Sequence, residues 1–269
     1  MLELLKAAQQ NRYAVGAFNV YNLEGALAVA RAAEAENSPA ILQVHPTALN
    51  RAGSGLIALC KQIALDARVP MAIHLDHCDS AEMIQAALNY GLTSIMVDGS
   101  HLLYDENVMF TAEMASRVHA AGGIVEAELG RISGSEDGLT VDALAARLTD
   151  PEQARNFIEH TKADMLAVCI GNVHGVYSGE VRFDFDRLAA IRAAVDIPLV
   201  LHGTSGVPDT LVRRAIEFGV VKFNVNTEVR SAFVEALKAT ESDELVQILD
   251  SAIEAMIEVV REKLRLFRH

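Results

Sequence analysis

Tryptophan is absent from this 269-residue sequence, and aromatic residues make up only 5% of it. Core volume must therefore come from alanine, valine, isoleucine and leucine, which suits helices packed closely around a parallel sheet. No apolar run approaches the roughly 20 residues that a membrane-spanning helix needs, and the first ten residues lack the apolar stretch of a signal peptide. We therefore expect a cytoplasmic protein with no membrane partner.

Cysteine and positive charge are also scarce. The cysteines at 60, 78 and 169 are widely spaced and form no C-x-x-C motif, so we expect reduced thiols in a cytosolic protein. Lys and Arg number 23 against 36 Asp and Glu, which gives a formal net charge of −13. That balance disfavours nucleic acid as a partner, but a local positive field could still bind a small anionic substrate.

Short apolar runs alternate with longer amphipathic stretches along the whole chain. The runs that predict strands lie near residues 15–18, 40–44, 71–75, 94–97, 124–128, 165–168, 199–201 and 221–225. Eight strands alternating with helices favour a parallel sheet closed into a barrel. We expect one domain over residues 1–269, an α/β fold of the (β/α)₈ TIM-barrel type. An extra C-terminal helix, from about residue 243 to 267, would cap the core or dock on a second subunit.

Polar and ionisable residues gather at the predicted carboxyl ends of these strands, the face of a barrel that holds the active site. These residues are Asn19, Asp76, His77, Asp98, Glu126, Glu128, His174, His202 and Asn224. Two long connections that contain glycines, 129–150 and 171–185, leave the same face. Long βα loops of this kind are typical of lids over active sites.

Three of these residues, His77, His174 and His202, predict a metal centre. Each follows an apolar run that is interpreted as a buried strand, and three imidazole ligands with one open position are typical of catalytic zinc. Cys78 follows His77, but adjacent residues on a strand point to opposite faces, so we interpret it as a small buried residue. His74 is interpreted as a hydrogen-bonded histidine inside the barrel.

The carboxylates near the predicted metal centre have more than one interpretation. Asp76 could exchange a proton with a bound oxygen, or it could orient a histidine by a hydrogen bond. It can share a site with His77 only if the strand ends near them. Asp98 could be an orienting residue. Glu126 and Glu128 lie on one strand face, which is costly in a core unless they are paired, and a nearby metal would explain them.

The segments after the last two predicted strands suit an anion. They are Gly203-Thr204-Ser205-Gly206 and Asn224-Val225-Asn226-Thr227. In barrels the loops after strands seven and eight recurrently bind phosphate through backbone N–H groups and a helix N-terminus. A metal-dependent hydrolase would use a metal-bound water and would need no such phosphate site, so these segments disfavour it.

Taken together, these motifs resemble the class II, metal-dependent ketose-bisphosphate aldolases, such as fructose-bisphosphate and tagatose-bisphosphate aldolases. The resemblance covers nearly the whole chain. It is carried by GAFNV at 16–20, HLDH at 74–77, VDGSH at 97–101, VEAELG at 125–130, TDP at 149–151, GNVHG at 171–175, HG at 202–203 and NVNT at 224–227.

The resemblance implies an aldehyde-lyase of carbohydrate metabolism, such as glycolysis. It would reversibly cleave a ketose 1-phosphate of the fructose or tagatose 1,6-bisphosphate type to dihydroxyacetone phosphate and an aldehyde through a zinc-stabilised enediolate. The three histidines would bind zinc, with Asp98 near the metal and Glu128 as an alternative ligand. A homodimer or homotetramer is expected.

The resemblance also implies roles for residues that transfer protons or bind substrate. Asp76 would transfer the proton of the C4 oxygen, and Glu136, on the first long loop, would transfer the proton at C3. Asn224 would contact the substrate's hydroxyl or enediolate oxygen. The remaining substrate and C1-phosphate contacts, together with a monovalent cation such as Na⁺ or K⁺, would come from Gly175, Gly203, Ser205, Asn226, Thr227 and Asn19.

One departure concerns the far end of the substrate. The family usually carries Asp-Pro-Arg ahead of the terminal helix, and that Arg binds the distal phosphate. Residues 241–247 contain neither Arg nor Pro. The alternative is therefore an aldolase for a ketose 1-phosphate with a neutral, carboxylate or sulfonate distal group, unless Arg131 or an Arg from a neighbouring subunit compensates. A non-catalytic barrel subunit of an aldolase complex is disfavoured, because the metal ligands and Glu136 are all present.

Overall fold

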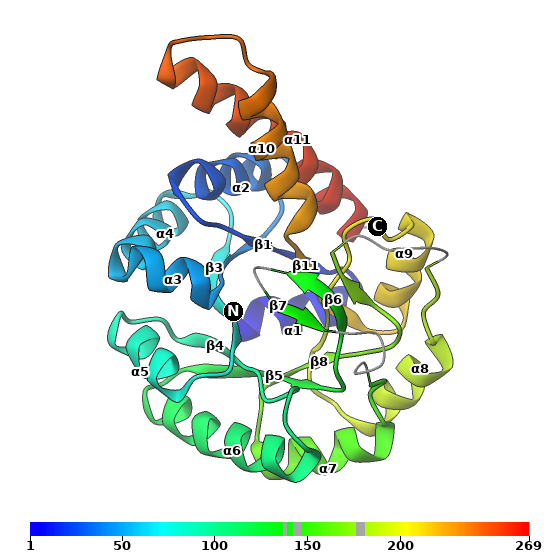
Figure 1. Ribbon diagram of the computed structural model, residues 1–269. Coiled ribbons are helices and arrows are strands. Elements are labelled where there is room, and N and C mark those ends of the chain that lie inside the picture. The colour runs from blue at the N-terminus through cyan, green and yellow to red at the C-terminus, as the bar shows by residue number, and fades with distance from the viewer. Residues whose placement is uncertain (137–138, 142–146, 176–180, 269) are drawn as a thin grey trace.

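The computed structural model describes residues 1–136, 139–141, 147–175 and 181–268, with side chains described throughout except at 135–136 and 139–141. Eight parallel strands close into a barrel in the order β1-β11-β10-β8-β5-β4-β3-β2 (Figure 1). They are β1 (Val15–Asn19), β2 (Ala40–Val44), β3 (Met71–Cys78), β4 (Ser94–Val97), β5 (Ile124–Leu129), β8 (Met165–Val168), β10 (Leu199–Leu201) and β11 (Val220–Val225). The predicted TIM barrel is confirmed, with β3 three residues longer than predicted.

Helices surround the barrel and connect its strands. They are α1 (Leu2–Asn11), α2 (Leu23–Ala35), α3 (Pro46–Ala52), α4 (Ser54–Asp66), α5 (Ala81–Asn89), α6 (Tyr104–Ala120), α7 (Pro151–Thr161), α8 (Phe185–Ala194), α9 (Asp209–Glu217), α10 (Thr227–Ala239) and α11 (Leu245–Phe267). Ser80 and Asp150 are the N-caps of α5 and α7, and their side chains accept hydrogen bonds from N–H groups of the first turn. Among the described residues, no helix is both long and apolar enough to cross a membrane.

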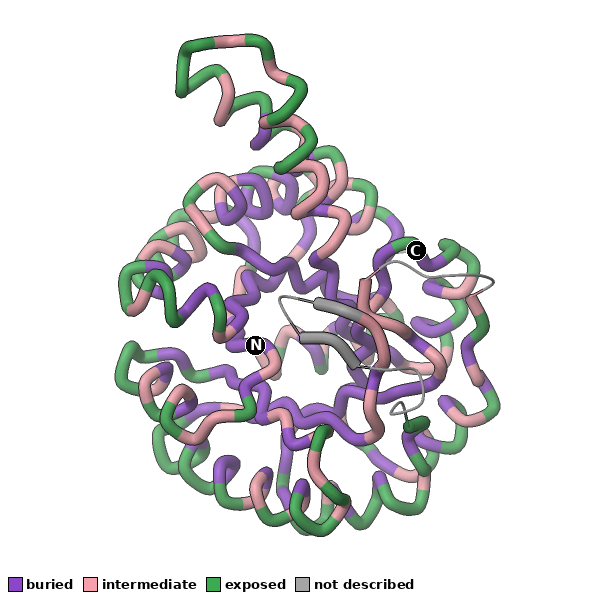
Figure 2. Tube along the Cα trace, in the orientation of Figure 1, coloured by how far each residue is buried: buried purple, intermediate pink, exposed green. Residues whose placement is uncertain are grey.

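The interior of the barrel is apolar at one end and polar at the other. At the amino ends of the strands, Leu5 and Ala8 of α1 close the barrel against Val15, Met165 and Val221. Figure 2 shows most of the barrel strands buried, with the exposed residues on the helices and loops; the first three residues of β3 are only partly buried. Nearer the carboxyl ends the buried side chains include Gln43, His74, Asp76, Glu126, Lys222 and Asn224. Apolar packing thus fills the barrel at the amino ends of the strands, and the polar side chains that could bind or react lie toward the carboxyl ends.

The two long loops pair with each other over the carboxyl end of the barrel. β6 (Ser133–Glu136) forms an antiparallel hairpin with β7 (Leu139–Val141), and it pairs in parallel with β9 (Val173–His174). Figure 1 shows this small sheet lying over the barrel centre. Gly134 has φ +111°, and a Cβ there would collide with the carbonyl oxygen of His174. Glycine at this position therefore lets β6 approach the strand that carries His174.

Helices α10 and α11 form an arm that is attached to the barrel only at its base. The buried residues of α11 begin at Ala252, and Phe267 stacks on Phe223 with ring centroids 5.0 Å apart. Figure 1 shows the other end of the arm projecting away from the barrel. Of the two roles predicted for the terminal helix, the structure thus shows capping of the core.

A cluster of ion pairs fastens α11 to the end of α2. Arg265 donates to both carboxylate oxygens of Glu36, at 2.9 and 2.7 Å, and Arg261 donates to one of them at 2.7 Å. The hydrogen bonds from Arg265 and Arg261 hold the pKa of Glu36 at about 2. The folded protein therefore binds a proton at Glu36 more weakly than the unfolded chain does.

We expect Glu36→Gln to lower the free energy of unfolding by about 1 kcal/mol at neutral pH, the scale of a partly exposed ion-pair network. Because the folded pKa lies below the unfolded value of about 4.3, this stabilisation is present above that value and is lost as the pH falls through the folded pKa. Urea denaturation should show the gap between wild type and variant closing between about pH 5 and pH 2. The exposed control Glu262→Gln should show no such closing, and a gap that persists at pH 2 would contradict the assignment.

Candidate metal centre and active site

Strand β3 brings Asp76 and His77 to one site through a local irregularity. Its pairing with β4 is regular at Leu75 and again at Cys78, with a register shift between them, and His77 has φ 41°. An irregularity of this kind breaks the alternation of side chains, so both residues turn inward. As predicted, the strand ends close to them: β3 ends at Cys78, one residue after His77, and the register shift lies just before that end. A left-handed conformation costs a residue with a Cβ roughly 1–2 kcal/mol.

The apolar interpretation of Cys78 is confirmed. Its side chain is fully buried among core residues, and burial raises the pKa of the thiol to about 12. Cys78 is in neither group of potential metal ligands among the described residues.

The side chains of His77, His174 and His202 converge. One ring nitrogen from each lies within 4.8 Å of the others, and Nε2 of His77 is 2.7 Å from Nδ1 of His202. The three come from different settings: His77 from the kink of β3, His202 directly after β10, and His174 from β9 above the barrel. His174 was predicted to follow a barrel strand directly. It lies instead in β9, because the segment after β8 pairs with β6.

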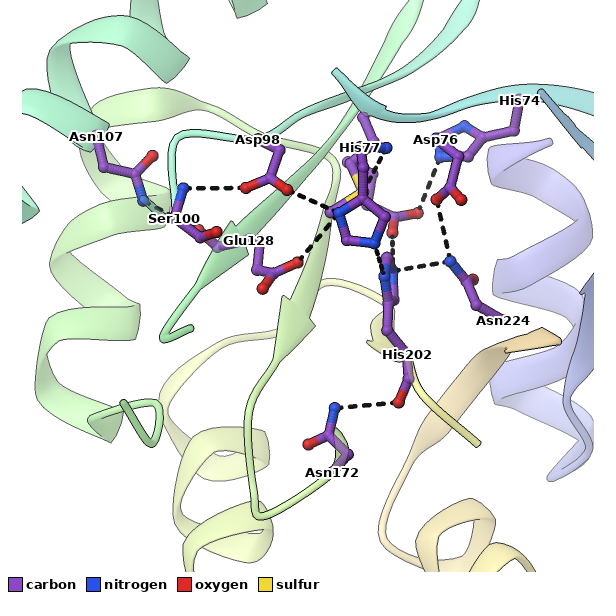
Figure 3. A network of polar contacts seen from close by, with 12 residues as sticks. His74, Asp76, His77, Asp98, Ser100, Asn107, Glu128, Asn172, His202 and Asn224 are labelled. Carbon is purple, nitrogen blue, oxygen red and sulfur yellow. Dashed lines mark hydrogen bonds and ion pairs between the residues drawn. The ribbon is translucent and has the colours of Figure 1, made fainter. Parts of the chain in front are cut away.

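Hydrogen-bond acceptors orient two of the three rings (Figure 3). Asp98 Oδ2 lies 2.7 Å from His77 Nδ1, which is the orienting contact expected of Asp98, and Glu126 Oε1 lies 2.9 Å from His202 Nε2. A carboxylate can only accept, so each of these nitrogens carries the hydrogen. The opposite nitrogens of the two rings then face the shared centre, as in metal sites where a carboxylate fixes the tautomer of the ligand.

The protonation of the three rings differs because their surroundings differ. Burial, together with the neighbouring His77, lowers the pKa of His202 to about 4, and burial lowers the pKa of His174 well below its usual value. Burial opposes charge on His77 too, but Asp76 and Asp98 outweigh it and raise its pKa well above the usual value. His77 is therefore the ring of the three that holds a second proton most strongly, and a divalent cation bound by the three rings would displace that proton.

Glu128 offers an independent test of whether a cation fits. Its side chain is buried, and its Oε2 has no hydrogen-bond partner among the described residues. That oxygen lies 3.7 Å from His77 Nδ1, and a ligand atom from each of His77, Asp98 and Glu128 falls within 4.8 Å of the others. Burial, and then the charge of Asp98, raise the pKa of Glu128. A buried carboxyl oxygen without a partner beside three imidazoles is well explained by a metal ligand.

Asp76 is held by two amides on the other side of the histidines. Its Oδ2 accepts from Asn19 at 2.9 Å and its Oδ1 accepts from Asn224 at 3.1 Å, while Gln43 donates to Asn19 Oδ1 at 3.1 Å. Burial alone would raise the pKa of Asp76, but His77, His202 and Lys222 lower it below its usual value. An ionised, precisely oriented carboxylate next to a metal centre can accept a proton from a bound hydroxyl.

The predicted phosphate-binding segments lie next to each other. Thr204 Oγ1 donates to the carbonyl of Asn224 at 2.8 Å, and Ser205 and Asn226 are buried. Thr227 is the first residue of α10, and its N-cap, Asn226, makes no capping hydrogen bond with its side chain. The side chain of Asn226 therefore does not cap the first-turn N–H groups of α10. An anion site at a helix N-terminus requires N–H groups that are not capped in this way.

Glycine in this region also has a packing role. Gly203 has φ +62°, and a Cβ there would meet the carbonyl of Val173. Glycine is thus needed for the loop after β10 to pack on β9, whether or not it also contacts phosphate. Gly206 N donates to Glu228 Oε1 at 2.7 Å, so one amide of this loop is already used. Gly175 follows His174 and is half-buried.

The proton-transfer residue predicted on the loop is only partly described. The backbone of Glu136 pairs with Leu139 in the β6–β7 hairpin, and Gly134, two residues earlier, pairs with His174. The side chain of Glu136 lies outside the described residues, so its role stays a prediction.

Residues inside the barrel were missed or misplaced by the sequence analysis. Lys222, which the sequence analysis did not single out, is the third residue of β11, and its side chain is fully buried. Glu126 was expected to be explained by a nearby metal. Its partners are instead His74, His202 and Lys222, and it is in neither group of potential metal ligands among the described residues. Asn172 donates to the carbonyl of His202 at 3.1 Å. The two-residue spacing of Lys222 and Asn224 was the available signal.

His74 behaves as expected of a hydrogen-bonded barrel histidine. It is fully buried, with Nδ1 2.8 Å from Ser94 Oγ and Nε2 3.3 Å from Glu126 Oε2. It lies toward Glu126 and Ser94, and it is not part of either group of potential metal ligands among the described residues.

Comparison with known proteins identifies the family. A sequence model for class-II fructose-bisphosphate aldolases matches residues 1–269. The chain belongs to this family. It is similar to a crystal structure from Coccidioides immitis, provisionally described as a fructose-1,6-bisphosphate aldolase, with 37% identity, a TM-score of 0.94 and coverage of 99% of this chain and 95% of that one.

Two further aldolase structures are similar over nearly the whole chain. The YdjI aldolase from Escherichia coli K12 has 34% identity and a TM-score of 0.89, covering 98% of this chain and 95% of that one. Fructose-bisphosphate aldolase from Campylobacter jejuni has 25% identity and a TM-score of 0.81, covering 98% and 93%. Membership of the class II aldolase family implies a lyase, which the sequence motifs had indicated.

Proposed function

We propose that this protein is a zinc-dependent aldolase that reversibly cleaves a ketose 1-phosphate to dihydroxyacetone phosphate and an aldehyde. The observation that carries the proposal is the meeting of His77, His174 and His202 beside the ionised Asp76 at the carboxyl end of the barrel. The start of α10, where the side chain of Asn226 makes no capping hydrogen bond, and the adjoining loop after β10 support a site for the C1 phosphate. Na⁺ or K⁺ would accompany that phosphate.

The three histidines would hold Zn²⁺, with Glu128 as an alternative ligand. When bound, the ion supplies a Lewis acid for the carbonyl and hydroxyl oxygens of the ketose, so that no lysine Schiff base is needed. Asp98 and Glu126 keep two ligand rings in the required tautomer and orientation.

Two carboxylates would move the protons. In the cleavage direction Asp76 takes the proton of the C4 hydroxyl, the C3–C4 bond breaks, and its electron pair stays with C3. Glu136, on the β6–β7 hairpin, then gives a proton to C3 to complete dihydroxyacetone phosphate. Asn19 and Asn224 hold Asp76 in place, and Asn224 contacts the substrate oxygen.

The distal group of the ketose is the open part of this proposal. Fructose or tagatose 1,6-bisphosphate is the default substrate, and a ketose with a neutral, carboxylate or sulfonate end is the alternative. Residues 240–244 connect α10 to α11 at the far tip of the arm, away from this chain's own barrel (Figure 1). Any contribution of that segment to the distal group would have to come from a second copy, in a homodimer or homotetramer.

We predict weak selection for a distal phosphate. Without the family's Arg, a phosphate there loses charge-assisted bidentate hydrogen bonds, each worth about 1.5–3 kcal/mol, or roughly tenfold or more in specificity. A panel of ketose mono- and bisphosphates, assayed for release of triose phosphate, tests both the function and this selectivity through kcat/KM. A strong preference for the bisphosphates would show that another cation, such as Arg131, replaces the missing Arg. No cleavage of any 1-phosphorylated ketose would refute the proposed function.

A further inference from the structure

Lys222 is the only lysine or arginine among the buried residues of the described chain, and its side chain is fully enclosed. It lies inside the barrel on β11, two residues before Asn224. An ammonium group loses its hydration on burial, so it remains charged there only with close, well-oriented acceptors. The acceptors of Lys222 therefore indicate which side chains it holds in position.

Two side chains accept from Lys222. Its Nζ lies 2.9 and 3.1 Å from the two carboxylate oxygens of Glu126, and 2.7 Å from Oδ1 of Asn224. An ammonium group donates and cannot accept, so the amide atom that faces it must be the oxygen. The oxygen and nitrogen of an amide are alike in shape, so they are told apart by their hydrogen-bond partners. The contact with Lys222 therefore fixes which way the Asn224 amide is turned.

The fixed amide turns its NH₂ group toward the reacting centre. Asn224 Nδ2 lies 3.1 Å from Asp76 Oδ1 and 3.1 Å from His202 Nε2. The second contact is not a hydrogen bond from the amide, because His202 Nε2 already carries a hydrogen for Glu126. One N–H of Asn224 therefore holds Asp76, and the other remains for an oxygen of the substrate.

The same lysine also acts on the metal centre through Glu126. The carboxylate that Lys222 neutralises is the acceptor for His202 Nε2 at 2.9 Å, and this contact leaves His202 Nδ1 facing His77. If the ammonium were absent, the buried carboxylate would lose its lysine partner and keep only the imidazoles of His74 and His202. His202 would then lose its preferred tautomer and orientation.

We propose that Lys222 is a positioning residue for both halves of the site: through Glu126 it orients the metal ligand His202, and through Asn224 it orients Asp76. It does not touch the substrate and forms no covalent bond to it. The inference deepens the proposed aldolase function and rests on it for the second half, whereas the first half concerns metal binding alone.

The first test measures metal binding without catalysis. Lys222→Met should weaken the affinity for Co²⁺, titrated into the metal-free protein and followed by its visible spectrum, by about 10–100-fold, the usual effect of losing an outer partner of a ligand. The exposed Lys61, whose Nζ donates to the Tyr90 carbonyl, provides the control Lys61→Met, which should bind Co²⁺ as the wild type does. Unchanged affinity in Lys222→Met would overturn the proposal, whatever the wild type's activity.

The second test is a double-mutant cycle on kcat at saturating metal. Lys222→Met should lower kcat about 10–100-fold with little change in KM, but by less than about threefold in an Asn224→Ala background, because the residue through which it acts is gone. An equal loss in both backgrounds would overturn the Asn224 half. A wild type that cleaves no ketose would refute the proposed function, while the Co²⁺ titration would still decide the role of Lys222.

A second variant covers the case in which Lys222→Met fails to fold. Lys222→Met combined with Glu126→Gln removes both buried charges and should restore folding, because neither side chain is then an uncompensated ion. Compared with Glu126→Gln alone, the double variant should lose a further factor of about ten in kcat. No further loss would show that Lys222 only balances the charge of Glu126, and would overturn the proposal.

Discussion

Removal of the divalent metal is expected to abolish ketose cleavage, and Zn²⁺ should restore it. The three histidines place one nitrogen each within 4.8 Å of the others. Among the described residues, the one other group that could hold a metal ion is His77, Asp98 and Glu128, which overlaps with it. A metal held here would stabilise negative charge on the substrate oxygens. A Lewis acid contributes several kcal/mol to such a transition state. Chelation followed by dialysis and metal titration, with triose phosphate release as the assay, measures the effect.

The same experiment has a chemical control. Borohydride in the presence of substrate should trap nothing, because the one buried lysine of the described chain, Lys222, is held by Glu126 and Asn224. Covalent capture of substrate on any lysine, or full activity after the metal has been removed, would contradict the metal-dependent mechanism.

The second large effect is expected from Glu136→Gln. The variant should keep its metal and bind substrate, but exchange of the C3 proton of dihydroxyacetone phosphate with solvent should slow by roughly 10²–10⁴, the usual contribution of a general acid or base. The register of the small sheet supports the choice of residue: Gly134 pairs with the metal-ligand candidate His174, and Glu136 follows on the same strand. NMR measurement of deuterium incorporation at C3 reports this step alone.

A matched control is the change of an exposed glutamate, Glu159→Gln on α7, which should leave exchange and cleavage unchanged. Retention of zinc by Glu136→Gln, measured by metal analysis, separates loss of a proton carrier from loss of the metal. Unchanged C3 exchange in Glu136→Gln would remove Glu136 from the mechanism.

The arrangement of elements followed from the sequence because it rests on local patterns. Buried parallel strands are short apolar runs, and eight of them alternating with helices leave few topologies other than a closed barrel. The candidate ligands His77 and His202 could also be assigned to the active-site face, because residues at the carboxyl ends of barrel strands share one face. The buried state of Cys78 followed from the alternation of a strand.

Long-range contacts decided the rest. The kink that turns both Asp76 and His77 inward appears only when β3 pairs with β4, because its irregularity is a mismatch between two strands distant in sequence. The position of His174 depends on pairing between the two long loops, which no single window of sequence contains. The end of the barrel closed by α1 likewise depends on packing between the first helix and strands from the whole chain.

The sequence by itself determined the family, the barrel and the residues able to bind a metal, because residue type and local periodicity suffice for those. Only the tertiary structure decided how the charges inside the barrel are compensated. Glu126 and Lys222 are 96 residues apart, and their pairing at 2.9 Å depends on two strands meeting across the barrel interior. The free energy of a buried charge depends on its neighbours in space, and those neighbours exist only once the barrel has closed.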